Sequence, residues 1–144
     1  MAKFDFNPKD VLKLADDLSR LSKIQDDPRV DAVLEKAADR LTQELKDSIE
    51  EKKLVDSKQL LNSIAPSRVL RDEKRGKHID VYPQGDREDG GRNAEVGFVN
   101  EYGADGRDIP ARHWMSDVID DKGNEIADMI AEGVADIIEE MFGE

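Results

Sequence analysis

The residues best able to do chemistry in this chain are its two histidines and its many carboxylates. The sequence has His78 and His113, 34 Asp and Glu residues, and no cysteine. A zinc site would need histidine and carboxylate ligands, but the HExxH spacing that places two histidines on one helix face does not occur. His78 falls in a predicted strand and His113 stands beside Trp114. We expect structural roles for both histidines and no metal site.

Motifs for nucleotide binding and covalent catalysis are also missing from the sequence. There is no Walker-type loop, no GxGxxG and no GxSxG, and Gly90-Gly91 has no predicted helix behind it. Among so many acids, carboxylate pairs of the glycosidase kind arise by chance, and we interpret them as a solvated face. Residues 120–125 lack the alternating ligands of a calcium loop, so we interpret them as a capped helix break. The sequence favours a protein without enzymatic activity or cofactor.

The net charge of −12 is concentrated in the last third of the chain. Residues 94–144 hold 3 Lys and Arg against 14 Asp and Glu, a net charge of −11, whereas residues 64–93 carry +1. An acidic surface repels phosphate backbones, so we expect no sequence-specific nucleic-acid binding there. Two charged sets are candidate contacts with neighbouring subunits or partners. They are a basic set, Arg68, Arg71, Lys74, Arg75 and Lys77, and an acidic row, Asp128, Glu132 and Asp136.

The basic set is open to several interpretations. It is a solvated hairpin tip, or it contacts phosphate, or it meets the acidic helix of a neighbouring subunit and so sets register and association rate. No interleaved aromatic residues favour single-strand nucleic-acid binding. The acidic row allows a further hypothesis, in which acidic helix faces line a channel and let DNA slide.

Hydrophobic periodicity predicts one α+β domain over residues 1–144, with its helical parts at the two ends. Residues 1–63 are predicted to be helical, with one helix that starts at Pro8 behind an Asn7 cap and a second from about residue 28 to residue 53. A short helical turn up to Ser63 would be capped by Asp56-Ser57. No run approaches the roughly 20 apolar residues that cross a bilayer, so we expect no membrane contact.

The middle of the chain changes period and predicts a small antiparallel sheet with long loops over residues 64–103. A charged hairpin occupies residues 71–77, and the alternation of polar and apolar residues predicts strands at residues 77–82 and 94–99. Residues 104–144 are predicted to form a loop and then a C-terminal helix, or a broken pair of helices, packed on the sheet.

The segment around Glu101 to Trp114 predicts a corner between a strand and the C-terminal helix. Gly103 allows a positive φ at the strand exit, and the residue before Pro110 is driven toward extended geometry. Arg112 brings a positive charge to a helix N-terminus, where it is mildly unfavourable. We therefore predict that Arg112 pairs with Glu101 and closes the loop.

The same segment resembles a family of small minor tail components, also called tail-completion or head–tail joining (neck) proteins, of long-tailed lambda-like bacteriophages and prophages. The resemblance rests on Asn100-Glu101-Tyr102-Gly103, then Ile109-Pro110-Ala111-Arg112 and Met115, and upstream on Leu60, Ser63 and Ile64. The residues singled out as a structural motif are Glu101, Tyr102, Gly103, Pro110, Ala111, Arg112 and Trp114. His113 stands where the family has a second proline, and Trp114 replaces its phenylalanine.

The resemblance implies a structural virion protein of the phage neck, made in the host bacterial cytoplasm and incorporated at the head–tail junction. Family members are thought to form rings that contact the connector on one side and the tail tube or tail terminator on the other. Such rings use head-to-tail interfaces that close. The acidic C-terminal third supports an alternative, a phage-encoded inhibitor or DNA mimic that binds a host factor.

Overall fold

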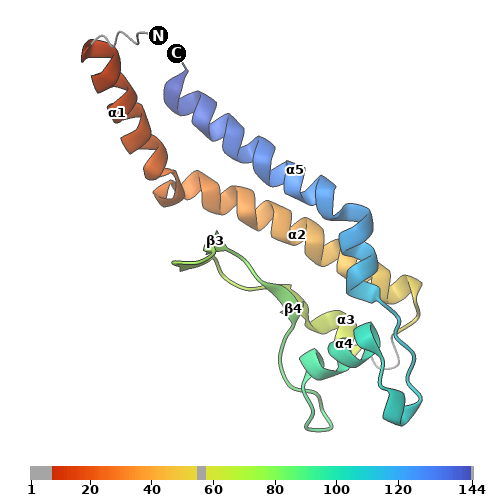
Figure 1. Cartoon of the computed structure of the whole chain (residues 1–144). Coiled ribbons are helices and arrows are strands. Elements are labelled where there is room, and N and C mark those ends of the chain that lie inside the picture. Colours follow the sequence, from red (N-terminus) through yellow and green to blue (C-terminus); the bar gives the residue numbers. More distant parts are fainter. Residues whose placement is uncertain (1–7, 55–57, 144) are drawn as a thin grey trace, which may run out of the picture.

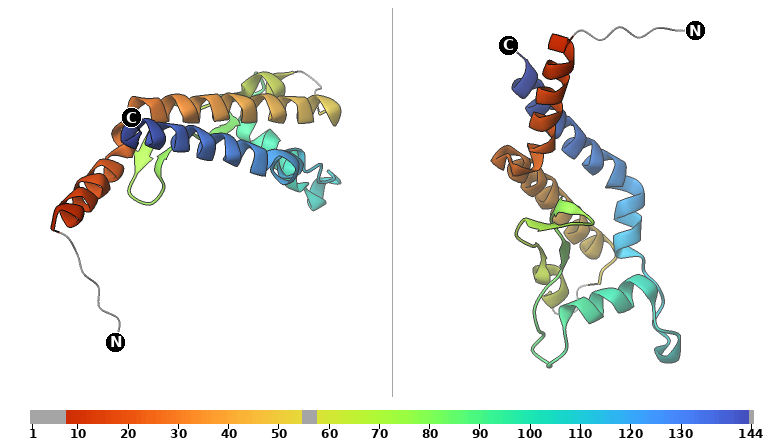
Figure 2. Two further views of the ribbon diagram at one scale, coloured as in Figure 1. Left: turned by 90° about the horizontal axis from the view of Figure 1, so that it is seen from above. Right: turned by 60° about the vertical axis from the view of Figure 1, so that its left-hand side comes forward.

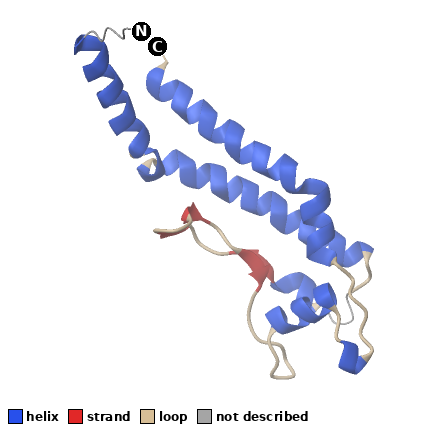
Figure 3. Ribbon diagram, viewed as in Figure 1, coloured by secondary structure: helices blue, strands red, loops and turns tan. Residues whose placement is uncertain are grey.

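The computed structural model describes residues 8–54 and 58–143, which form an elongated α+β fold (Figures 1 and 2). Helices dominate, and the strands form a small region beside them (Figure 3). In chain order the elements are α1 (Pro8–Ser22), the 3₁₀ turn η1 (Ile24–Asp26), α2 (Pro28–Glu51), α3 (Gln59–Ser63), β1 (Ile64–Pro66), β2 (Leu70–Asp72), β3 (Gly76–His78), β4 (Val81–Pro83), α4 (Asn93–Tyr102), the 3₁₀ turn η2 (Asp105–Arg107) and α5 (Trp114–Phe142).

The two predicted N-terminal helices are present as α1 and α2, joined by η1. Asp27 caps α2, because its carboxylate accepts a 2.9 Å hydrogen bond from the Arg29 backbone N–H, and Pro28 follows at the first helical position. The predicted caps Asn7 and Asp56-Ser57 lie outside the described residues. None of the described helices has the length and apolar content needed to cross a lipid bilayer.

The body of the molecule is an antiparallel pair of long helices, α2 and α5 (Figure 1). Ion pairs join opposite ends of the pair: Lys52 lies 2.5 Å from Asp117, and Arg29 contacts Glu140. Between them the helices approach closely at Gly133, where a Cβ atom would lie 2.8 Å from the Val33 side chain. These contacts fix the direction and register of α5 on α2.

Apolar burial is concentrated where α5 begins. A single core cluster joins α2, α3, β1 and the first turns of α5, and β4 and α4 pack against it with Val81 and Val96. Its buried members are Leu45, Ile49, Leu60, Ile64, Trp114 and Val118. The C-terminal helix therefore packs on the β region through its first two turns.

The β region consists of two short antiparallel pairs, β1 with β4 and β2 with β3. The hairpin predicted at residues 71–77 is confirmed as β2–β3, with Asp72 opposite Gly76. The strand predicted at residues 77–82 is instead divided at Asp80. The Ser67 backbone N–H donates a 2.7 Å hydrogen bond to the Asp80 carbonyl, and the Asp80 backbone N–H donates a 3.0 Å hydrogen bond to the Ser67 hydroxyl oxygen. These bonds separate β3 from β4 and let the chain change partners.

Two predicted boundaries are wrong. Residues 94–99 belong to helix α4 and not to a strand, so the β part of residues 64–103 ends at Pro83. Asn93, Gly97 and Glu101 are buried at helical spacing, and this row of small and polar residues fixes the helix. The expected break at residues 120–125 is absent because α5 continues through Gly123. A single glycine within a helix costs only about 1 kcal/mol. The burial of α5 residues before and after Gly123 outweighs this cost.

Candidate functional site

The corner between α4 and α5 contains the residues that the sequence singled out, and its centre is a buried carboxylate. Glu101, at the end of α4, is 1% exposed. Its carboxylate accepts hydrogen bonds from the backbone N–H of Met115 at 2.7 Å and of Ser116 at 3.1 Å, and from the Ser116 hydroxyl. Glu101 thus caps the N-terminus of α5, where negative charge is favoured.

The predicted ion pair between Glu101 and Arg112 is wrong, because each charge has another partner. The Arg112 guanidinium donates a 2.7 Å hydrogen bond to the carbonyl of Lys52, the residue that ends α2. A cation is stabilised at a helix C-terminus, just as the Glu101 anion is at an N-terminus. The two charges of the corner therefore stabilise the ends of two different helices, Glu101 the N-terminus of α5 and Arg112 the C-terminus of α2.

Gly103 and Trp114 hold the loop between these helices. Gly103 has φ +78°, and a Cβ there would lie 2.8 Å from the Ala111 nitrogen and the Ile109 oxygen. Trp114 is completely buried, and its indole N–H donates a 2.8 Å hydrogen bond to the Gly97 carbonyl. A second hydrogen bond, from the Ser48 hydroxyl to the Trp114 carbonyl, ties the same residue to α2. Pro110 and Ala111 are exposed members of the motif.

Tyr102 differs from its neighbours in the motif because its side chain lies outside the corner. It is 61% exposed on the outer face of α4, and Phe98, one turn earlier, is 60% exposed. Their ring centroids lie 4.7 Å apart at an interplanar angle of 51°. We call Phe98 and Tyr102 the aromatic patch. Sequence reasoning missed it, because a strand would have placed Phe98 in the sheet.

Three cations of the basic set form ion pairs within the chain. Arg71 lies 2.5 Å from Asp26, Lys77 pairs with Asp31, and Arg75 lies 3.2 Å from both Asp72 and Asp80. The hydrogen bond from Arg71 lowers the pKa of Asp26. A hydrogen bond from the Arg75 backbone, first among several, lowers the pKa of Asp72.

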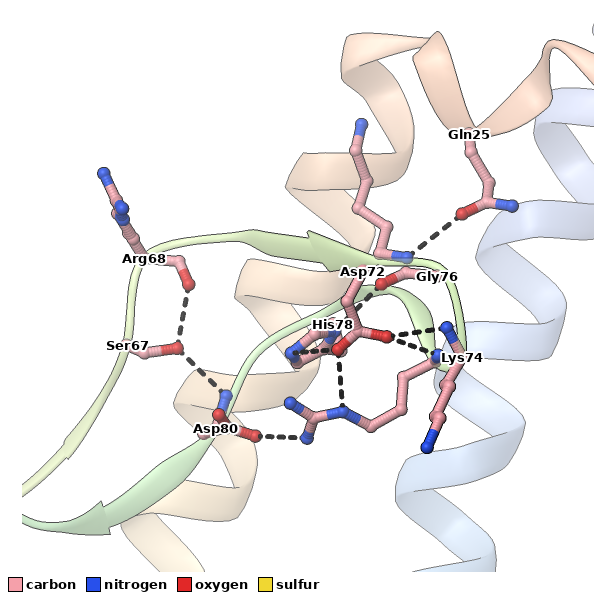
Figure 4. A network of polar contacts seen from close by, with 10 residues as sticks. Gln25, Ser67, Arg68, Asp72, Lys74, Gly76, His78 and Asp80 are labelled. Carbon is pink, nitrogen blue, oxygen red and sulfur yellow. Dashed lines mark hydrogen bonds and ion pairs between the residues drawn. The ribbon is translucent and has the colours of Figure 1, made fainter.

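Two cations of the basic set, Arg68 and Lys74, make no ion pair with any residue that the structure describes. The hairpin itself is held to η1, because the Lys77 backbone N–H donates to the Gln25 side chain at 3.0 Å (Figure 4). Charge reversal at Arg71 or Arg75 would therefore disturb the fold of the chain as well as any contact between chains.

The acidic row stays exposed on α5. Asp128, Glu132 and Asp136 are four residues apart, so they follow one side of the helix, and within the described chain they form no ion pair. Glu132 and Asp136 line a shallow groove with Val33, Lys36 and Met129. The row is a continuous strip of negative charge along the body of the molecule.

Helix α1 carries exposed apolar side chains. None of the fifteen residues of α1, all of them described, is buried. Val11, Leu14 and Leu18 recur at three- and four-residue spacing on one side, and Leu14 is 59% exposed. We call these three residues the apolar row. Hydrophobic periodicity predicted the helix that starts at Pro8, but not that its apolar side would stay exposed.

No cluster suited to metal binding accompanies these surfaces in residues 8–54 and 58–143. Groups of three or more His, Asp or Glu side chains that could hold a metal ion are absent from that part of the chain. His78 is engaged by the Gly76 carbonyl at 2.9 Å and lies in the hairpin, and His113 lies at the start of α5. Comparison with family models, curated proteins and solved structures found no match.

Proposed function

We propose that this protein is a structural subunit of the neck or tail junction of a tailed bacteriophage, acting in tail completion or head–tail joining. The observation that carries the proposal is the exposed apolar row of α1. An amphipathic helix gains most of its stability from covering its apolar side, so a helix that leaves this side in water is suited to assembly with another surface.

The resemblance to head–tail joining proteins supports the same conclusion. Its residues fall together at one corner, where Glu101, Gly103 and Trp114 hold α5 on α4. Leu60 and Ile64, from the upstream part of the resemblance, belong to the same core cluster as Trp114. Motif residues far apart in sequence thus share one structural task, and Tyr102 adds an exposed contact residue beside them.

The proposed location is the virion, with copies arranged as a ring between the connector and the tail terminator or tail tube, after synthesis in the host bacterial cytoplasm. The test is deletion of the gene from the phage or prophage that carries it. We expect filled heads and separate tails, with joining restored when the protein is supplied from a plasmid. Normal infectious particles from the deletion strain would contradict the proposal.

The acidic row favours a second candidate function, a DNA mimic that inhibits a host factor. Asp128, Glu132 and Asp136 present a strip of negative charge along an exposed helix, as a DNA backbone does. A mimic acts as a monomer or dimer and competes with DNA for its target. Size measurement with electron microscopy separates the two candidates: rings on phage particles favour the structural subunit, and a small stable complex with a DNA-binding host protein favours the mimic.

A further inference from the structure

One polar side chain of α1, Arg20, attaches the helix to its own chain, and the apolar row stays exposed. The Arg20 guanidinium lies over the Phe142 ring, 4.9 Å from its centroid, and donates a 2.6 Å hydrogen bond to the Met141 carbonyl. Both contacts place a cation at the C-terminus of α5, where it is stabilised. Arg20 lies nearly opposite Leu18 around the helix, so this attachment directs the apolar row away from α5.

The aromatic patch lies at the other end of the molecule. In Figure 1 α1 extends from the upper end, whereas α4 lies at the lower end beyond the core, and the right-hand view of Figure 2 agrees. The apolar row and the aromatic patch therefore cannot meet within one chain. Two different patches at opposite ends of one subunit form a head-to-tail contact when one patch binds the other patch of a second copy. Repetition of such a contact closes a ring or extends a filament.

Electrostatic repulsion disfavours the alternative contact, in which two copies pair symmetrically along α5. A symmetric pairing of two copies along α5 would set two acidic rows against each other, which repel. The charged residues of α1 are balanced instead, three basic and three acidic: Lys9, Lys13, Arg20, Asp10, Asp16 and Asp17. The exposed carboxylate beside the aromatic patch, Glu95, is paired with Arg92 at 3.2 Å. An approach of α1 to α4 thus carries no net like-charge penalty.

We propose that the apolar row of α1 packs on the aromatic patch of a second copy of this chain. Two rigid rings one helical turn apart offer an anchor of the kind that dominates protein interfaces, and Val11, Leu14 and Leu18 provide the aliphatic side chains to enclose them. The contact names the surfaces by which ring subunits would join, and in that sense it rests on the proposed function.

The absence of native cysteine makes the test direct. Leu14→Cys and Tyr102→Cys chains are made separately, mixed and oxidised with oxidised glutathione, and the linked species are identified by mass. We expect a disulfide-linked heterodimer of the two variants, far above the yield from Leu14→Cys mixed with the exposed control Asn124→Cys. A chain with both cysteines should link into multimers.

Each other outcome overturns the inference. Self-linked Leu14→Cys dimers in excess of the heterodimer would mean that two α1 helices pair with each other. Equal yields with the Asn124→Cys control would mean that α1 does not meet α4. As an independent readout, Leu18→Glu or Phe98→Ala should weaken self-association in sedimentation by roughly tenfold or more, while the exposed aromatic control Tyr82→Ala leaves it unchanged.

Failure of this contact and failure of the proposed function are distinguishable. If deletion of the gene leaves heads and tails unjoined but no heterodimer forms, the protein acts at the junction through other surfaces. If the heterodimer forms but virions assemble normally without the gene, copies of the chain associate head to tail in another setting.

Discussion

Apolar side chains are buried at the corner between α4 and α5 but exposed on helix α1. At the corner Trp114 is completely enclosed, and its indole N–H and its backbone carbonyl are both hydrogen-bonded. In α1 the apolar row is mostly in water, and the helix is held to the body by Arg20. The start of α5 and α1 both carry apolar residues at helical spacing, so the difference lies in whether the same chain provides the opposing surface. One end stabilises the subunit, and the other is the surface that we propose for contact with a neighbour.

The largest effect should come from removing the anchor of the corner. Trp114→Ala would empty the centre of the core cluster and leave the Gly97 carbonyl without its donor, so we expect a loss of about 3–5 kcal/mol in unfolding free energy. Leu18→Ala in α1 should change it by less than about 0.5 kcal/mol, when urea unfolding is measured at a concentration where the chain is monomeric. Similar losses in the two variants would break the comparison, because α1 would then be packed within its own subunit.

The second effect concerns the capping carboxylate. Glu101→Gln exchanges one acceptor oxygen for an amide that faces the donors of Met115 and Ser116, so we expect a loss of about 1–3 kcal/mol. Glu95→Gln, on the exposed side of the same helix, is the matched control and should be nearly neutral. Thermal unfolding of both variants measures the difference.

A double-mutant cycle sharpens the assignment of partners. Glu101→Gln and Ser116→Ala should be coupled, whereas Glu101→Gln and Arg112→Gln should add independently, because Arg112 binds the Lys52 carbonyl. Strong coupling between Glu101 and Arg112 would restore the pairing that the sequence suggested and contradict the capping role.

Apolar spacing was sufficient to predict most of the helices. The stripes of α1 and α2, the start of α2 near residue 28, and the β2–β3 hairpin all follow from local patterns. Periodicity does not reveal which helix will find cover, however. The stripe of α1 differs little from that of α2, yet only α2 has a long helix against it.

The corner was harder to predict because its buried row is not apolar. Asn93, Gly97 and Glu101 face inward, while Phe98 and Tyr102 face out, which reverses the usual pattern and mimics the alternation of a strand. The burial of Glu101 depends on N–H donors fourteen and fifteen residues later. The sequence showed that these residues belong together but not which atoms meet.

The third effect tests backbone geometry at the corner. Gly103→Ala would force a side chain into a positive-φ conformation and against the backbone of Ala111, so we expect a loss of about 1–3 kcal/mol. Gly106 is two residues into the same loop's 3₁₀ turn and has open space around its Cβ position. Gly106→Ala should therefore be neutral or slightly stabilising, and equal losses at the two positions would show that the loop lacks the strain we describe.

The smallest effect is a pH dependence at the point where exposed α1 passes into packed α2. The pKa of Asp27 is lowered to about 2, first by the hydrogen bond from the Arg29 side chain and then by that from its backbone. A carboxyl whose pKa is depressed on folding stabilises the fold above its ordinary pKa of 3.8 and loses that contribution as the pH falls through about 2. Asp27→Asn, which still caps α2, should therefore flatten the fall in stability between about pH 4 and pH 2, whereas Asp16→Asn in α1 should leave it as in the parent chain. Urea unfolding across this range measures the slope. If Asp16→Asn flattens the curve as much as Asp27→Asn does, α1 contributes to acid stability like the packed helix, and the contrast between the two ends is weaker than the structure indicates.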